Sequence, residues 1–188
     1  MKNVIIFGCP RAGKTTSAKR LNEELKFNII SIDSIVTAFE RIFPEMNIKH
    51  GGDIIEKAKK FAPFLYEYIE RAIWEYTDRN FVLEGWHNLP DYFMPLINQE
   101  NYVVICLGYP NADEKDLFNK IRKNDTEHDN TVNVTDEHLK NLIHESKISS
   151  ELLKEQCQKW EIPFFETDKN REQVLNKVVK YIKKAIYN

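Results

Sequence analysis

Residues 4–25 read VIIFGCPRAGKTTSAKRLNEEL and place three patterns in direct succession. The run Val4–Phe7 is short, apolar and rich in β-branched residues, which favours a strand. Residues 8–15 match the pattern G-x-x-x-x-G-K-[ST], and residues 14–25 repeat apolar side chains at helical spacing. Because the pattern binds phosphate when it lies between a strand and a helix, its surroundings here support that interpretation.

The residue types of this loop suit a phosphate ligand. Gly8 and Gly13 permit a close approach of the backbone that a side chain would block, so that successive N–H groups turn toward one anion. Lys14 supplies a positive charge for the β- and γ-phosphates, and the Thr15 hydroxyl is a ligand for Mg²⁺. We therefore expect ATP and Mg²⁺ as cofactors, with Arg11 exposed to solvent. The residues expected to bind the nucleotide are Gly8, Cys9, Pro10, Arg11, Ala12, Gly13, Lys14, Thr15 and Thr16.

Farther along the chain, short apolar runs alternate with helical patterns. The expected strands cover residues 29–32, 81–83, 103–107 and 163–165. The expected helices cover residues 35–43, 54–76, a segment that starts at Thr135, and 170–187. Pro63 is expected to kink or divide the helix 54–76. Strands that are apolar on both faces and separated by helices predict an α/β fold, with a parallel sheet covered by helices.

The composition is that of an ordinary globular domain. The 188 residues are 42% hydrophobic and 30% charged, with a net charge of −2 and three cysteines. Such a chain buries a sizeable core, contains no run that suits a membrane span, and lacks the positive field that attracts polyanions. The cysteines show no C-x-x-C pairing, and the N-terminus shows no secretion signal. We expect one soluble, cytoplasmic domain over residues 1–188, without nucleic-acid or membrane partners. The sequence does not predict its oligomeric state.

Two carboxylates follow expected strands, Asp33 after residues 29–32 and Glu84 after residues 81–83. Ligands of an open parallel sheet gather at the carboxyl edge of its strands, so both side chains are expected to face the phosphates. Phosphoryl transfer needs a group that orients or deprotonates the acceptor hydroxyl, and we assign this role to Asp33. Glu84 is expected to hold the water shell of Mg²⁺ or to bind substrate, and the reverse assignment is open. The alternatives are a helix N-cap for Asp33 and a strand-end salt bridge for Glu84.

The loop, the Ile-Asp-Ser segment of residues 32–34 and Leu83-Glu84-Gly85 resemble the adenylate-kinase-like P-loop kinases. The match looks like shikimate kinase, gluconate kinase and the chloramphenicol phosphotransferases, and it covers nearly the whole chain in sequence order. The resemblance implies a five-stranded parallel sheet of order 2-3-1-4-5 with helices on both faces. It also implies transfer of the γ-phosphoryl group of ATP to a hydroxyl of a small-molecule acceptor, with the strand-two Asp, here Asp33, as catalytic base.

The same resemblance implies a small lid at about residues 113–134, whose arginines cover the transferring phosphate. The matching segment holds Arg122 between two lysines and no clear second arginine. Arg122 is expected to stabilise transition-state charge, with a solvated helix face as the alternative. Polar residues 124–133 are expected to form a mobile excursion. Residues 167–170 lie where such folds contact adenine, although a helix-capping turn is an open alternative.

The acceptor pocket is less defined by the sequence. Trp86 follows Glu84 closely and is expected either to stack on the acceptor or to pack in the core. His87 is interpreted as loop or pocket lining, because it lacks metal-like partners. Arg41 lies two helical turns after Asp33 and is expected to reach an anionic acceptor, with surface exposure as the alternative.

Three functions are open on this scaffold: a small-molecule kinase, a nucleoside or nucleotide kinase, and a nucleotide-sensing module without an acceptor. A GTPase is disfavoured because the patterns N-K-x-D and D-x-x-G do not occur at suitable positions. An AAA-type motor is disfavoured because no expected strand ends in paired Asp-Glu. We predict the small-molecule kinase.

Overall fold

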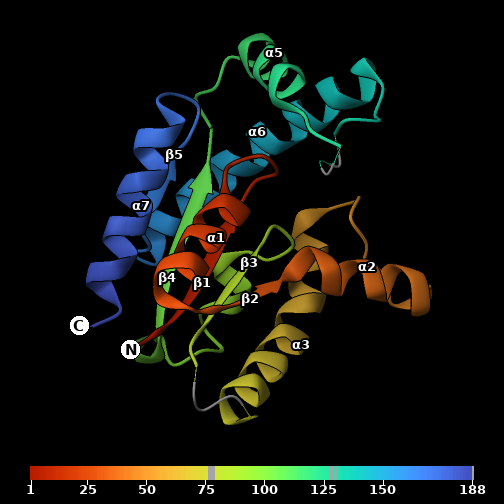
Figure 1. Cartoon of the computed structure of the whole chain (residues 1–188). Coiled ribbons are helices and arrows are strands. Elements are labelled where there is room, and N and C mark those ends of the chain that lie inside the picture. Colours follow the sequence, from red (N-terminus) through yellow and green to blue (C-terminus); the bar gives the residue numbers. More distant parts are fainter. Residues whose placement is uncertain (76–78, 128, 130, 188) are drawn as a thin grey trace.

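A five-stranded parallel sheet forms the centre of the molecule (Figure 1). The computed structural model describes residues 1–75, 79–127, 129 and 131–187. The strands are β1 (Asn3–Gly8), β2 (Asn28–Ser31), β3 (Phe81–Gly85), β4 (Tyr102–Gly108) and β5 (Phe164–Glu166). They lie in the order β2-β3-β1-β4-β5, and each neighbouring pair is parallel. The predicted fold class and strand order are confirmed.

Helices connect these strands and cover both faces of the sheet (Figure 1). They are α1 (Lys14–Leu25), α2 (Ile32–Ile42), α3 (Ile54–Glu75), α4 (Pro90–Phe93), α5 (Glu114–Asn124), α6 (Asp136–Lys159) and α7 (Arg171–Ala185), with short 3-10 turns η1 (Pro44–Met46) and η2 (Gln99–Asn101). Helices α1 and α7 share one buried cluster with the sheet, whereas α2, α3, α4 and α6 share another. The molecule therefore has three layers.

Strand β1 shows why both layers are required. Ile5 and Phe7 belong to the core beneath α3 and α4, whereas Val4 and Ile6 belong to the core beneath α1 and α7. Successive side chains of a strand point to opposite faces, and all of these are fully buried. A strand that is apolar on both faces is stable only between two layers of helices.

The boundary between β2 and α2 differs from the sequence-based expectation. β2 ends at Ser31, and Ile32 with Asp33 forms the first turn of α2 rather than the end of a strand. Ser31 occupies the N-cap position in an extended conformation. The N-cap alternative for Asp33 is therefore wrong, and its carboxylate lies in the first turn of a helix at the edge of the sheet.

Helix α3 continues through Pro63, so of the two expected outcomes, a kink or a division, the division is wrong. Phe61, Ala62 and Leu65 around the proline are fully buried, and this packing outweighs the lost backbone hydrogen bond. The expected last residue of this helix, Tyr76, lies outside the described residues.

The segment of residues 113–134, which the resemblance predicts to be a lid and which is called the lid segment below, consists of α5 and the chain that leads to α6. Figure 1 shows α5 and the start of α6 projecting beyond the carboxyl ends of the strands. Ile121, Leu139 and Ile143 hold these two helices together in a small apolar cluster of their own. Most of the predicted excursion at residues 124–133 is described and consists of turns, although residues 128 and 130 lie outside the described part.

The two ends of the described chain meet beside the sheet, where the Lys2 amide donates to the Ile186 carbonyl at 3.0 Å. Within the described residues, every helix is too short or too polar to cross a bilayer.

Candidate nucleotide and acceptor site

The glycine-rich loop joins β1 to α1 at the carboxyl edge of the sheet. A Cβ at Gly8 would lie 2.2 Å from the Leu107 carbonyl oxygen, so only glycine fits beside β4. Gly13 is the N-cap residue of α1 with a φ of 98°, and Arg11 has a φ of 64°. These left-handed conformations make the tight turn before the helix. The first amides of α1 have no helical acceptor, so they and the helix dipole form an anion site.

Neighbouring elements brace this loop from behind. The Cys9 amide donates to the Leu107 carbonyl at 3.1 Å, and the Tyr109 hydroxyl donates to the Pro10 carbonyl at 2.7 Å. The Cys9 Sγ lies 2.9 Å from the Ser150 Oγ, and burial raises the pKa of this thiol to about 12. Cys9 therefore packs and braces, and Pro10 has no N–H to offer. The Cys9 amide is thus engaged by β4, and the contacts of the loop with a nucleotide stay a prediction.

Lys14, Thr15 and Glu84 meet at the start of α1. The buried Lys14 Nζ donates to the Cys9 carbonyl at 2.9 Å. The Thr15 Oγ1 lies 3.2 Å from both Glu84 carboxylate oxygens. Burial raises the pKa of Glu84, whereas the Lys14 charge and the Thr15 hydroxyl act in the opposite direction. The carboxylate at the end of β3 thus faces the loop, as the sequence predicts.

This donor set fits Mg²⁺. A threonine hydroxyl and a carboxylate are the hard oxygen ligands that Mg²⁺ prefers, and it commonly takes the rest of its shell from phosphates and water. Thr15 and Glu84 are the residues that would hold the ion directly or through water. The ion supplies positive charge at the β- and γ-phosphates when it is bound.

Asp33 lies across the same edge, beside Glu84. Ser31 pairs with Glu84 in the sheet, so Asp33 begins just beyond the end of β2. Its Oδ1 is buried, has no hydrogen-bond partner among the described residues, and lies 3.5 Å from the His87 Nε2. The side chain as a whole is 41% exposed, so the rest of the carboxylate faces open space. The expected meeting of the two carboxylates at this edge is therefore present in the structure.

Behind Asp33 lies a polar cluster that the sequence did not predict, formed by Thr37, His50, Lys57 and His87. The Lys57 Nζ lies 2.9 Å from the His50 carbonyl oxygen and 3.2 Å from the His87 Nδ1. The His87 Nε2 lies 3.1 Å from the His50 Nδ1, and the His50 Nε2 lies 2.8 Å from the Thr37 Oγ1. His87, which the sequence analysis interpreted as loop or pocket lining, contacts both Lys57 and His50 and is thus the hub of the cluster.

Burial shapes the charges of this cluster. It lowers the pKa of His87 to about 2, and the Lys57 charge acts in the same direction. Burial also lowers the pKa of Lys57 to about 8, although the Asp33 carboxylate opposes this shift. The signal that the sequence did offer is a lysine on the apolar stripe of α3, since Lys57 directly precedes Ala58 and lies one turn before Phe61.

Arg11 of the loop reaches the lid. Its guanidinium pairs with Asp129 and lies 3.2 Å from the Asp125 carboxylate. The side chain is half-buried, so the expectation of an exposed Arg11 is wrong. Arg171, at the start of α7, also lies beside the loop, because a Cβ at Gly13 would be 3.3 Å from its guanidinium. The sequence analysis did not identify Arg171.

Arg122 lies within the lid and holds its turn together. The guanidinium donates to the Thr131 and Val134 carbonyls at 2.9 and 2.7 Å and lies 2.9 Å from the Asp136 carboxylate. The side chain is partly buried, which rules out a fully solvated helix face. Its predicted contact with a transferring phosphate stays a prediction.

The remaining predicted residues lie around this edge. Arg41 is exposed in the last turn of α2. Trp86 is half-buried and packs against the core beneath α1 and α7. The Thr167 amide donates to the Gly108 carbonyl at 2.9 Å, and Asn170 occupies the N-cap position of α7 without a side-chain cap. Thr167 therefore extends the β4–β5 pairing by one residue, and the predicted adenine contact of residues 167–170 stays a prediction.

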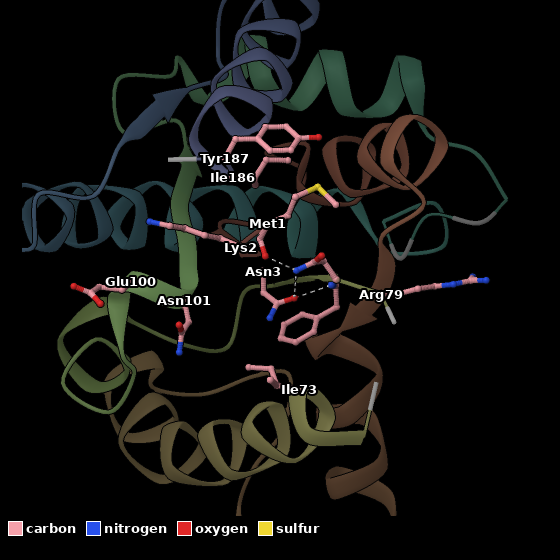
Figure 2. A pocket seen from close by; sticks show the side chains of 11 residues that line it. Met1, Lys2, Asn3, Ile73, Arg79, Glu100, Asn101, Ile186 and Tyr187 are labelled. Carbon is pink, nitrogen blue, oxygen red and sulfur yellow. Dashed lines mark hydrogen bonds between the residues drawn. The ribbon is translucent and has the colours of Figure 1, made fainter. Parts of the chain in front are cut away.

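A hollow of about 670 Å³ lies at the opposite edge of the sheet (Figure 2). Figure 2 shows Met1, Lys2 and Asn3 at the start of β1 beside residues 79–81, 100–101 and 186–187. The Asn80 side chain donates to the Met1 carbonyl there at 2.8 Å. Ligands of open parallel sheets lie at the carboxyl ends of the strands, so this hollow is separate from the candidate site.

Comparison of the sequence with known proteins gives one relevant likeness. No family model matches the chain. A tRNA dimethylallyltransferase from Malacoplasma penetrans (strain HF-2) is 29% identical over 164 residues, which is 78% of this chain and 52% of that protein. The chain thus spans about half the length of the curated relative that it matches.

Comparison of the structure with solved structures confirms the fold. A gluconokinase from Sinorhizobium meliloti 1021 has a TM-score of 0.61 and 13% identity, over 100% of this chain and 94% of its own. A sugar kinase from Janibacter sp. HTCC2649 has a TM-score of 0.59 and 13% identity, over 100% of this chain and 97% of its own. A shikimate kinase from Bacteroides thetaiotaomicron has a TM-score of 0.53 and 16% identity, over 99% of both chains. The chain therefore has the fold of the P-loop kinases, and the resemblance seen in its sequence is confirmed at that level.

Proposed function

We propose that the protein transfers the γ-phosphoryl group of ATP to a hydroxyl group of a small-molecule acceptor. One observation carries this proposal: Asp33, with one carboxylate oxygen buried and the side chain partly open, lies at the same sheet edge as Lys14 and the Thr15–Glu84 contact. A phosphate site and a free carboxylate at one edge are the parts that phosphoryl transfer requires.

Each residue of this edge has a role in the proposed reaction. The amides at the start of α1 and the Lys14 ammonium bind the β- and γ-phosphates. The Asp33 carboxylate accepts the proton of the acceptor hydroxyl while the new O–P bond forms and the bond to the ADP oxygen breaks. ADP then leaves with the electron pair of that bond. Thr15 and Glu84 hold Mg²⁺, or Glu84 holds its water shell.

Residues around the edge complete the proposed site. Arg122 lies in the lid segment 113–134, and a rearrangement of that segment would bring its charge to the transferring phosphate. Trp86 and the exposed Arg41 are the residues proposed to bind the acceptor, since an aromatic ring and a cation suit a polar or anionic molecule. Among the loop residues proposed for nucleotide binding, Thr16 lies in the first turn of α1 beside the anion site.

The likeness to a tRNA dimethylallyltransferase provides a second candidate, in which the same loop holds a phosphorylated donor and tRNA is the acceptor. The net charge of −2 argues against it, since nucleic-acid binding draws mainly on positive surface charge.

Phosphorus NMR of the purified chain with ATP, Mg²⁺ and separate acceptor panels tests the proposal. The panels are hydroxylated metabolites, nucleosides with their monophosphates, and tRNA. We expect a new phosphate-ester signal with one of the hydroxylated metabolites. Phosphorylation confined to nucleosides or monophosphates would make the protein a nucleotide kinase. Tight ATP binding without any phosphorylated product would contradict phosphoryl transfer and favour a nucleotide-sensing module.

A further inference from the structure

The polar cluster behind Asp33 has only one consistent direction of hydrogen bonding. A lysine ammonium can only donate, so the His87 Nδ1, 3.2 Å from the Lys57 Nζ, must accept. His87 is neutral, because burial lowers its pKa to about 2. Its single ring proton therefore lies on Nε2, the nitrogen that faces His50 and Asp33.

This Nε2–H has two acceptors within reach. The His50 Nδ1 is 3.1 Å away and the Asp33 Oδ1 is 3.5 Å away. When His87 donates its proton to the His50 Nδ1, His50 must carry its own proton on Nε2. The His50 Nε2–H then donates to the Thr37 hydroxyl at 2.8 Å. Thr37 then donates to the main-chain carbonyl of Asp33 at 2.9 Å. The chain of donors thus starts at Lys57 and ends at Asp33.

The Asp33 Oδ1 is the acceptor that this network leaves without a bond. A buried carboxylate oxygen without a donor is costly, and such atoms in native proteins call for an explanation. His50 belongs to the exposed segment between η1 and α3, whereas His87 is only 2% exposed. Because His50 is exposed, it can move away from His87 more easily than Asp33 can. When His50 has moved away, the Asp33 Oδ1 is the remaining acceptor for the His87 Nε2–H.

We propose that His87 is a positioning residue for Asp33: its Nε2–H donates to the Asp33 Oδ1 and leaves the second carboxylate oxygen to take the acceptor proton. Lys57 fixes the tautomer that makes this donation possible. In the free protein the Nε2–H is shared between the His50 Nδ1 and the Asp33 Oδ1, which lie 3.1 and 3.5 Å away. This inference rests on the proposed function and deepens it, because it assigns the support of the proposed base.

A purely structural role for the cluster makes different predictions. If these side chains only fill the space between α3 and β3, any variant that folds should keep the rate of phosphoryl transfer. If His87 orients Asp33, removal of the Nε2–H should lower kcat without changing the KM for ATP, and a side chain with a donor at the same reach should restore part of the rate. Glutamine offers such a donor, and leucine does not.

The first arm of the test is nitrogen-15 NMR of the histidine side chains in the whole protein, without substrate. We expect His87 as the neutral Nε2–H tautomer near pH 7, with its Nε2 resonance shifted in Asp33→Asn. Lys57→Met should give a mixture of tautomers, whereas Lys60→Met, an exposed position on the same helix, should leave the spectrum unchanged. An Nδ1–H tautomer in the wild type, or no response to Asp33→Asn, would overturn the inference.

The second arm measures turnover with the acceptor that the phosphorus NMR screen identifies. His87→Leu and Lys57→Met should lower kcat by about 10- to 100-fold, as the loss of an orienting outer hydrogen bond does elsewhere. His87→Gln should recover part of this loss, and Lys60→Met should be unaffected. Wild-type kcat in His87→Leu, with Asp33→Asn inactive, would refute the positioning role and leave the proposed function intact. If no acceptor is phosphorylated, the proposed function fails, and the NMR arm alone decides whether His87 donates to Asp33.

Discussion

The proposed nucleotide half and the proposed acceptor half of the site are built from different parts of the chain. The nucleotide half consists of one contiguous loop, residues 8–16, whose main-chain amides and helix terminus make the anion site, with Glu84 as its distant contributor. The acceptor half consists of side chains from α2, the segment before α3, α3 and the end of β3, namely Asp33, His50, Lys57 and His87. Main-chain recognition is thus encoded locally, whereas side-chain recognition exists only once the fold is complete.

The two halves also differ in their electrostatics. Lys14 and the start of α1 present positive charge to a ligand, and Arg11 and Arg171 lie nearby. In the acceptor half, Lys57 lies in the field of the Asp33 carboxylate, and the histidine between them is neutral. Variants in the nucleotide half should therefore change affinity for ATP, and variants in the acceptor half should change turnover.

The largest expected effect comes from Asp33→Ala. Loss of the proposed base should lower kcat by about 10²- to 10⁴-fold. The affinity for ATP–Mg, measured by calorimetry, should stay within about twofold, because Asp33 belongs to the acceptor half. Ser34→Ala, an exposed neighbour in the same helical turn, is the matched control and should keep full turnover. An active Asp33→Ala would remove this residue from the mechanism.

The next effect concerns Gly85, which follows Glu84 and ends β3. A Cβ there would lie 2.4 Å from the Ile32 Cβ, so Gly85→Ala forces β3 and α2 apart. Overpacking of this kind should lower the free energy of unfolding by about 1–3 kcal/mol in urea titrations. Gly51→Ala serves as the control, since a Cβ at Gly51 meets nothing within 4 Å. Equal free energies of unfolding for the two variants would contradict the close packing of Gly85 in β3 against Ile32 in α2.

The sequence predicts the nucleotide half of the site better than the acceptor half. The loop, the position of Glu84 and the parallel sheet follow from contiguous patterns and from the alternation of strands and helices, whereas the strand order was implied by the resemblance to the P-loop kinases. Lys57 and His50 were missed because they come from segments without a motif and meet His87 only through the packing of α3 against β3. Asp33 was identified as a site residue, but not as a helical one, because Ile32 fits a strand as well as the first turn of α2.

A third effect is a dependence of stability on pH. The pKa of His87 is lowered to about 2 in the folded protein, so below about pH 6.5 only the unfolded chain takes up this proton. Stability should therefore fall as the pH drops below that value, with His87 contributing at most about 1.4 kcal/mol per pH unit. Urea titrations of His87→Gln should show a flatter slope than the wild type, whereas exposed His138→Gln should not. An unchanged slope in His87→Gln would show that His87 is protonated in the folded protein.

The smallest effect is expected for Glu84→Gln, which replaces the β3 carboxylate that contacts Thr15 of the loop. Burial raises the pKa of Glu84 in the folded protein, so the unfolded chain loses this proton at a lower pH than the folded protein does. The free energy of unfolding therefore falls as the pH rises from the ordinary glutamate pKa through the raised pKa. Glutamine removes this loss of stability, so the urea midpoint near pH 7 should rise. Turnover should fall about fivefold at limiting Mg²⁺, and excess Mg²⁺ should restore part of it. A variant that is less stable at neutral pH would contradict a strained, buried carboxylate.

The central claim is that the loop of residues 8–16, with the Lys14 ammonium, binds the phosphates of a nucleoside triphosphate. Calorimetric titration of the wild type, Lys14→Ala and the exposed control Lys19→Ala with ATP–Mg tests it most directly. We predict that Lys14→Ala weakens binding by about 10- to 100-fold, the range for losing hydrogen bonds to a charged group, and that Lys19→Ala binds like the wild type. Equal affinity of Lys14→Ala and the wild type for ATP–Mg would contradict the claim.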